Sequence, residues 1–382
     1  MKYSPWLAGL ALVPMLSMSA QAQDSLQDNI RFFGDLRFGG VAFDRDERDG
    51  SNFDQTRLQV RARAGLQWQI SDVYSAGVRY AARVHNTDNE SAEFKLYRAV
   101  PRGASSIHPG QSTLDQLYVR AQYGQWQHTV GRFQLSNLLV GIPDKSFSRT
   151  DSTSWDVSWT DGIHSRYTLP SGWQVNMIVE HNSKKGPTHI RRAPLWFDQS
   201  ASRASYYVSL DHSQPDGLFL QRSLDVTVMP SALYYDGLLH NRQRDYIGFT
   251  GRLGLQWQLP GSTRLVAGGE LAWAPETPTW AALNLPGQGK ADGFGYQLTF
   301  NLVDFRPGHS IGMIHGEADG GWLLSTDFTN NQSQTELRYS WEVMQGHTFQ
   351  ARIRQRDELR QHIGAERKRS ETDMFIRYTI TI

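Results

Sequence analysis

Hydrophobic and polar residues alternate strictly over residues 57–70, and the alternation resumes after a turn at Ser71-Asp72. The apolar positions are Leu58, Val60, Ala62, Ala64, Leu66, Trp68 and Ile70, and the positions between them include Arg57, Arg61 and Arg63. A period of two is typical of a β-strand with one apolar and one polar face. A membrane strand of about 9–11 residues with lipid outside and water inside requires this pattern, which therefore favours a transmembrane β-barrel.

The same alternation recurs over residues 246–259, 334–343 and 374–382. The sequence Gly-Leu-Gln-Trp-Gln occurs at 65–69 and again at 254–258, each time just before a short turn. Three further tryptophans lie beside short turns, and these are Trp126, Trp173 and Trp341. Tryptophans repeated at one level predict an aromatic girdle at a membrane interface.

The connections between these strands are alternately short and long. Short turns rich in Gly, Pro, Ser and Asp fall at 71–72, 124–125, 170–172, 214–217, 260–262, 304–308 and 345–346. Long polar connections fall at about 44–54, 86–113, 136–160, 183–203, 229–245, 274–292, 316–332 and 357–371. They predict an all-β fold, one antiparallel transmembrane barrel of sixteen strands with short periplasmic turns and long extracellular loops. Eighteen and fourteen strands are the alternatives, and the register stays open over 126–135, 218–228 and 309–316.

The start of the chain predicts export. Lys2 precedes an apolar stretch from Trp6 to Met18, and Ala20-Gln21-Ala22 fits the rule for signal-peptide cleavage. We therefore expect a signal peptide over residues 1–22 and a barrel over 23–382, and an uncleaved anchoring helix is the alternative. The chain contains no cysteine, which excludes disulfides and thiolate metal sites.

The strand count, the leader and the final strand, which ends on Ile382, together resemble the Gram-negative outer-membrane porins across the mature chain. Gly131-Arg132 and Asp161-Gly162 add local similarity, although no signature motif selects a subfamily such as the general diffusion or the phosphate-selective porins. The resemblance implies that the loop after the fifth strand, about 136–160, folds into the lumen and narrows it. Folding over the rim is the alternative. The apolar centre of this loop runs from Leu138 to Pro143. The charged residues of the loop include Asp144, Lys145, Arg149, Asp151 and Asp156.

Arginines predominate on the polar faces of the first and last strands. Removal of Lys2 leaves 38 basic and 38 acidic residues, so their distribution matters more than their sum. We predict a pore-lining basic wall of Arg37, Arg57, Arg61, Arg63, Arg79, Arg83, Arg352, Arg354 and Arg377, with Arg120 and Arg132 further round. Acidic residues face it from elsewhere in the barrel, among them Glu180, Asp211, Asp225 and Glu270. The alternative is that these arginines keep the pore wet and pair with neighbouring carboxylates.

These patterns predict a passive diffusion channel for small hydrophilic solutes, with weak anion preference. The alternatives are a substrate-specific channel for carboxylates, phosphate or sugars, a non-conducting structural barrel, and a barrel enzyme. We expect no catalysis, cofactor or metal, because no catalytic or metal-ligating motif is present. We expect contact with outer-membrane lipid and lipopolysaccharide, no nucleic-acid partner, and polar or anionic small solutes. A homotrimer is implied by the resemblance alone.

Overall fold

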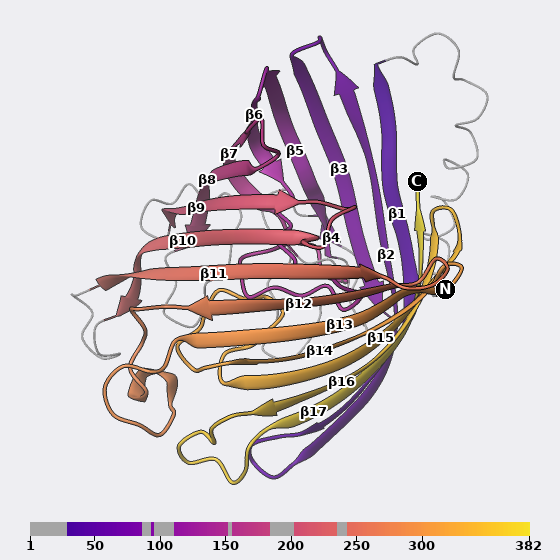
Figure 1. The fold of residues 1–382 in the computed structure, drawn as a ribbon. Coiled ribbons are helices and arrows are strands. Elements are labelled where there is room, and N and C mark those ends of the chain that lie inside the picture. Colours follow the sequence, from indigo (N-terminus) through magenta and orange to yellow (C-terminus); the bar gives the residue numbers. More distant parts are fainter. Residues whose placement is uncertain (1–28, 86–92, 95–110, 152–154, 184–201, 235–242) are drawn as a thin grey trace, which may run out of the picture.

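The computed structural model describes residues 29–85, 93–94, 111–151, 155–183, 202–234 and 243–382. Sixteen antiparallel strands close into a barrel, as the alternating pattern predicts (Figure 1). The barrel strands are β1 (Ile30–Asp46), β2 (Asn52–Gln69), β3 (Tyr74–His85), β5 (Gln111–Tyr123), β6 (Trp126–Phe133), β7 (Thr160–Thr168), β8 (Gln174–Ser183), β9 (Ser202–Ser213), β10 (Gln221–Tyr234), β11 (Gln243–Gln258), β12 (Arg264–Trp273), β13 (Phe294–Arg306), β14 (His309–Ala318), β15 (Gln332–Met344), β16 (His347–Glu358) and β17 (Ser370–Thr381).

Two short elements lie outside the barrel wall. The strand β4 (Glu93–Phe94) pairs in parallel with β5, and the 3₁₀ turn η2 (Ala281–Leu283) lies in the connection between β12 and β13. Within the described part of the chain, no helix is long and apolar enough to cross a bilayer.

The first and last strands close the barrel. Strand β1 pairs with β2 on one side and with β17 on the other, from Asp35 opposite Thr381 to Asp46 opposite Ser370. The end of the chain continues this ladder, because the Ile382 N–H donates to the Gly34 carbonyl at 3.0 Å. Closure leaves the barrel without an exposed sheet edge.

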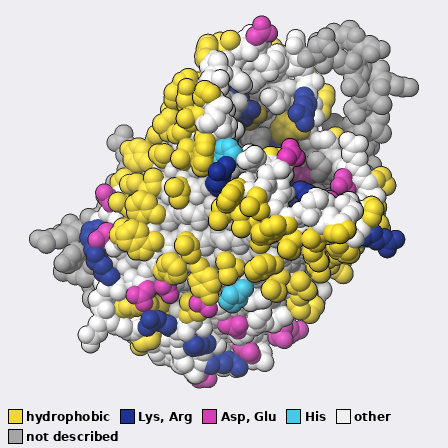
Figure 2. Space-filling view, in the orientation of Figure 1, with side chains coloured by type: hydrophobic (Ala, Val, Ile, Leu, Met, Phe, Trp, Pro, Cys, Tyr) yellow, Lys and Arg dark blue, Asp and Glu magenta, His cyan; other side chains and the backbone are white. Residues whose placement is uncertain are grey.

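On most strands, burial separates an outer apolar face from an inner polar face. On β2, Leu58 is 61% exposed whereas Arg61 is 0% exposed, so the apolar side chains point outward. Figure 2 shows a broad hydrophobic outer surface, with charged side chains gathered at the rim and around the hollow. The described part of the barrel therefore has the inverted polarity that a membrane protein with a wet interior requires.

Three expectations about boundaries need correction. The connection expected at about 44–54 spans only residues 47–51, because β1 and β2 keep pairing up to Asp46 opposite Asn52. The polar residues there suggested a loop, yet Arg45 pairs with Glu371 at 2.6 Å and holds the strand end in the wall. Likewise, β10 continues to Tyr234 and β11 begins at Gln243. The strand β4 lies within the connection expected at 86–113 and was not predicted.

The register is now defined where the sequence left it open. Val130 of β6 lies opposite Val119 of β5, Leu224 of β10 lies opposite Leu210 of β9, and Met313 of β14 lies opposite Phe300 of β13. The expected signal peptide, residues 1–22, lies outside the described residues.

Candidate functional site: the inner wall and the loop that crosses it

The inner face of β1, β2, β3, β16 and β17 carries a ladder of arginines. The strand register places Arg37 directly opposite Arg61, and Arg61 directly opposite Arg83. Two residues further along β1, Gly39 lies opposite Arg377 of β17, and Phe375 of β17 lies opposite Arg352 of β16. The predicted basic residues of these strands are therefore neighbours across the closure.

Carboxylates are interleaved with these arginines, and two of them, Asp35 and Asp115, were not predicted from the sequence. Asp35 accepts from Arg61 at 2.9 Å and also pairs with Arg63. The Asp115 carboxylate on β5 accepts hydrogen bonds from Nε and from one terminal nitrogen of Arg79, each at 2.8 Å. Such a two-pronged contact fixes the guanidinium plane.

The same interleaving continues on β15, β16 and β17. Asp373 pairs with Arg354 at 2.7 Å and also with Arg352. Glu336 pairs with Arg338, and Glu371 pairs with Arg356. The wall is thus a ladder of both charges, and arginines outnumber carboxylates on the inner faces of β1 to β3, where Asp35 is the one carboxylate among the described inward positions.

Aromatic rings hold several of the guanidinium groups against the wall. Phe375 lies beneath both Arg352, at 4.3 Å from the ring centre, and Arg377, at 4.9 Å. Phe43 lies beneath Arg57 at 5.3 Å. A guanidinium stacked on a ring keeps its charge while losing side-chain freedom. These arginines are therefore oriented rather than freely mobile.

Two predicted arginines lie apart from the ladder. Arg132 is buried, pairs with Asp161 at 2.8 Å and lies 4.3 Å from the ring centre of Trp159. Arg120 donates to Thr129 at 3.2 Å and lies over the Tyr118 ring. They belong to the wall formed by β5 and β6, and the structure does not bring them into the row that contains Arg37 and Arg61.

The connection between β6 and β7, residues 134–159, contacts inward-facing residues from many strands. Its backbone N–H groups donate to side chains of the wall. The Val140 N–H donates to Gln221 on β10, and the Ile142 N–H donates to Asn301 on β13, each at 2.8 Å. Further on, Asp144 pairs with Arg338 on β15, and Asp156 pairs with Arg83 on β3. The described parts of this loop thus contact opposite sides of the barrel.

One inward glycine shows how closely the loop approaches the wall. A Cβ added to Gly312 on β14 would lie 2.8 Å from Pro143 Cδ and 2.9 Å from Ile142 Cβ. Any larger residue would displace the loop or the strand, so glycine at this position permits the contact.

The remaining charged loop residues predicted from the sequence are buried among partners. Arg149 pairs with Glu180 on β8 and donates to Ser205 at 3.2 Å. Asp151 accepts from the Leu135 N–H at 2.7 Å, which ties the two ends of the loop together. Lys145 lies 3.5 Å from Glu336 and 3.6 Å from Asp327. Burial lowers the pKa of the Lys145 ammonium, and both carboxylates oppose that shift.

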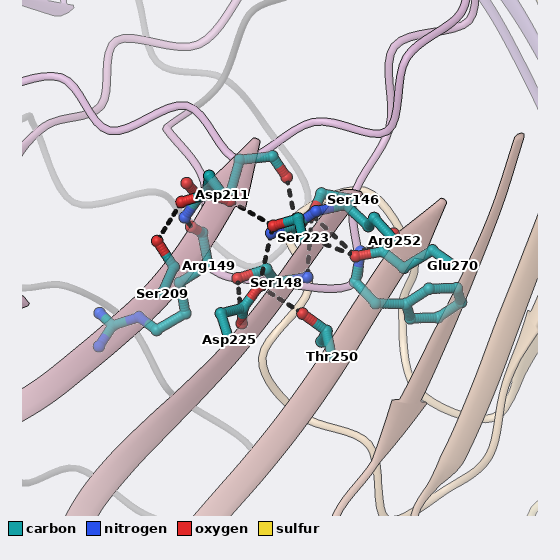
Figure 3. A network of polar contacts seen from close by, with 12 residues as sticks. Ser146, Ser148, Arg149, Ser209, Asp211, Ser223, Asp225, Thr250, Arg252 and Glu270 are labelled. Carbon is teal, nitrogen blue, oxygen red and sulfur yellow. Dashed lines mark hydrogen bonds and ion pairs between the residues drawn. The ribbon is translucent and has the colours of Figure 1, made fainter. Parts of the chain in front are cut away.

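A second charged cluster lies on the opposite wall, on β10, β11 and β12 (Figure 3). Arg252 is buried between Asp225, at 2.5 Å, and Glu270, at 3.1 Å. Loop residues supply further donors, since Ser148 Oγ donates to Asp225 at 3.0 Å and the Phe147 N–H donates to Glu270 at 2.9 Å. Two carboxylates here share one arginine, and the loop completes their hydrogen bonding.

The described residues contain no group of three or more His, Cys, Asp or Glu side chains that could hold a metal ion. The loop cluster of Lys184-Lys185 and Arg191-Arg192, which the sequence suggested as a basic surface, lies outside the described residues.

The fold is that of solved outer-membrane channels. OprB of Pseudomonas putida is similar with a TM-score of 0.62 and 11% identity, over 98% of this chain and 97% of that one. The outer membrane channel DcaP of Acinetobacter baumannii is similar with a TM-score of 0.55 and 12% identity, over 92% and 97%. A mutant of the Rh. blastica porin is similar with a TM-score of 0.50 and 10% identity, over 92% and 100%.

No protein-family model and no curated protein sequence matches the chain. The likeness is therefore one of fold, and the chain adopts the closed sixteen-stranded barrel of the Gram-negative outer-membrane porins, with its subfamily unresolved.

Proposed function

We propose that the chain is an outer-membrane porin through which small hydrophilic solutes diffuse passively. The observation that carries this proposal is the closed barrel whose outward residues are mostly apolar and whose inward residues are mostly polar and charged. The fold-level likeness to OprB and to the DcaP channel supports it. Export through a cleaved signal peptide, contact with lipopolysaccharide and homotrimer formation belong to the same proposal.

In this proposal, loop 134–159 is the element that narrows the lumen. Its contacts with β3, β10, β13 and β15 support that role, because a loop lying over the rim would not reach inward residues on these strands. Asp144 and Asp156 have side chains that are 33% and 38% exposed, so they present carboxylates to the passage while bound to Arg338 and Arg83.

The arginine excess on β1, β2 and β3 gives the proposed pore a weak anion preference. Guanidinium groups stay charged at any accessible pH, and fixed charges on a wet wall raise the local concentration of counterions. The interleaved Asp35 and Asp115 reduce the net field, and the loop carboxylates reduce it further. We therefore propose a bias between small anions and cations, and no strict filter.

Reconstitution in a planar lipid bilayer tests this function. Stepwise ohmic current, with a reversal potential on the anion side in a salt gradient, is expected for the porin. Silent insertion of folded protein would instead support a structural barrel, and turnover of an ester or peptide substrate would support a barrel enzyme. Strong cation selectivity of the unmodified protein would contradict the arginine part of the proposal.

A further inference from the structure

A second loop, residues 319–331 between β14 and β15, packs against loop 134–159. Its Trp322, Leu324 and Phe328 are buried, and they form one apolar cluster with Phe147 of the first loop. The Phe147 and Phe328 rings stack with their centres 4.4 Å apart. The rest of the cluster comes from β10, β11, β12, β14 and the residue just after β12: Met229, Ala232, Leu233, Tyr246, Ala272, Ala274, Ile314 and Ala318.

An apolar inner wall is unexpected in a barrel with a wet interior, so these positions require a cover. Glycine at position 248 on β11 makes room for the second loop, since an added Cβ would lie 2.5 Å from Leu324 Cδ1 and 3.1 Å from Trp322. The buried Tyr246 hydroxyl receives the Leu323 N–H at 3.0 Å and donates to the Gly321 carbonyl at 3.1 Å. The wall of β10 to β14 is thus shaped to hold loop 319–331.

Ser146 and Phe147 lie between this second loop and the wall, and side chains satisfy all four of their backbone polar groups. The Ser146 N–H donates to Asp327 at 3.0 Å, and its carbonyl accepts from Ser325 at 2.5 Å. The Phe147 N–H donates to Glu270 at 2.9 Å, and its carbonyl accepts from Trp322 Nε1 at 3.2 Å. Three of these four partners belong to loop 319–331, and the fourth belongs to β12.

We infer that Glu270, Trp322, Ser325 and Asp327 form a socket that holds Ser146-Phe147, and that the two loops act as one internal body. This inference rests on the proposed pore, because it makes loop 319–331 the element that keeps loop 134–159 in place. The two loops together close the β10 to β14 side of the lumen, so solutes pass along the arginine wall. Buried backbone groups need partners, and the socket supplies them only while both loops are docked.

The absence of native cysteine allows a direct test. Ser148→Cys places a thiol at a 0% exposed position next to the socket, and Ser136→Cys places one at an exposed position of the same loop. Reaction with a membrane-impermeant maleimide is measured for each in folded protein. The docked body predicts slow labelling at position 148 and fast labelling at position 136.

In the Ser148→Cys variant, the further substitutions Trp322→Phe and Ser325→Ala remove both donors to the Ser146 and Phe147 carbonyls. They keep an aromatic ring in the apolar cluster. Labelling at position 148 should then accelerate roughly ten- to thirtyfold, because loss of two hydrogen bonds favours local opening. The matched control is Trp257→Phe with Ser262→Ala, which makes the same two changes at an exposed strand position and an exposed turn. The control should leave labelling unchanged.

The inference would be overturned if Trp322→Phe with Ser325→Ala left the labelling rate at position 148 unchanged. Fast labelling at position 148 in the protein with an intact socket would also overturn it. Gly248→Ala is a second variant, which crowds the second loop without removing any hydrogen-bond donor. Its control is Gly40→Ala on the outer face, where the nearest side-chain atom is 3.6 Å away. Heat-modifiable migration on a gel verifies that each variant is folded. Absence of current in the unmodified protein would refute the proposed pore, whereas the labelling result would still decide whether the socket exists.

Discussion

The two sides of the barrel interior use the same residue types in opposite proportions. On β10, β11 and β12, Asp225 and Glu270 share Arg252, and loop atoms fill the remaining hydrogen-bonding positions. On β1, β2 and β3, arginines exceed carboxylates, and Arg61 and Arg63 share Asp35. One wall has surplus acceptors and the other has surplus donors.

The difference explains which wall the loop covers most completely. A backbone segment brings N–H groups, and hydroxyl side chains add further donors, so surplus carboxylates can bind it. Ser146, Phe147 and Ser148 all donate to carboxylates on the β10 to β12 wall or on the adjacent loop. On the wall of β1 to β3, guanidinium groups instead bind hydroxyl and amide oxygens, as Arg37 binds Thr379, and loop carboxylates, as Arg83 binds Asp156. The composition of each wall thus determines how closely the loop packs against it.

The largest expected effect is a loss of heat resistance when the acceptor-rich wall of β10 to β12 loses its arginine. Arg252→Met leaves Asp225 and Glu270 buried without a cation, and removing one partner of a buried ion pair costs about 3–5 kcal/mol. The folded band on an unboiled gel should therefore disappear at a lower temperature than for the unmodified protein. The control is Arg264→Gln, which removes an exposed arginine 3.9 Å from Asp304 and should change stability by no more than about 1 kcal/mol.

Adding Asp225→Asn and Glu270→Gln to Arg252→Met should restore part of the lost heat resistance. Neutral amides still accept from Ser148 and Phe147, and no buried charge is left unpaired. If Arg252→Met alone is as heat resistant as the unmodified protein, charge balance does not stabilise this wall.

The next effect tests the donor-rich wall. Replacing Arg61, Arg63 and Arg79 together by Gln should move the reversal potential in a salt gradient towards cations, because Asp35 and Asp115 then lose their counterions. Adding Asp35→Asn and Asp115→Asn should reverse most of that shift. An unchanged reversal potential in the triple variant would show that this wall does not face the conducting path.

A smaller shift in the opposite direction is expected from the loop. Asp144→Asn with Asp156→Asn removes two partly exposed carboxylates and releases Arg338 and Arg83 from them. The reversal potential should move towards anions, by less than in the triple arginine variant, because each released arginine keeps its charge. The control is Asp151→Asn, a buried residue that ties the loop ends together and should leave selectivity unchanged. An unchanged reversal potential would place these carboxylates away from the passage.

The sequence predicted the barrel because alternation is a property of each strand by itself. Leu58 and Arg61 fall on opposite faces whatever the neighbouring strands are, and the number of strands follows from counting turns. The same rule places Glu336 on the inner face with Arg338, and it could also have found Asp35, which shares a face with Arg37. The predicted wall contained basic residues alone, so Asp35 was left out of it.

Other features depend on contacts that no single strand encodes. The bond between Asp115 and Arg79 depends on the register between β3 and β5, which shifts at a bulge beside Arg79. The contact of Ser146 with Asp327 joins positions 181 residues apart, and neither neighbourhood has a distinctive motif. The apolar cluster around Phe147 also breaks the rule that inward positions are polar, so alternation alone could not reveal it.

The smallest expected effect separates the two walls by their response to salt. The Debye length falls from about 10 Å at 0.1 M salt to about 3 Å at 1 M, and water-facing charges are screened far more than buried ones. The anion preference should therefore decline across this range, because Arg63 and Asp156 keep 16% and 38% of their side chains exposed. The slow labelling at Ser148→Cys should persist, because the side chains of Asp225, Arg252 and Glu270 are at most 1% exposed. Both are measured on the same preparation, by reversal potential and by maleimide reaction. Labelling that accelerates with salt would mean that screened, exposed charges hold the loop, and the contrast between the two walls would then fail.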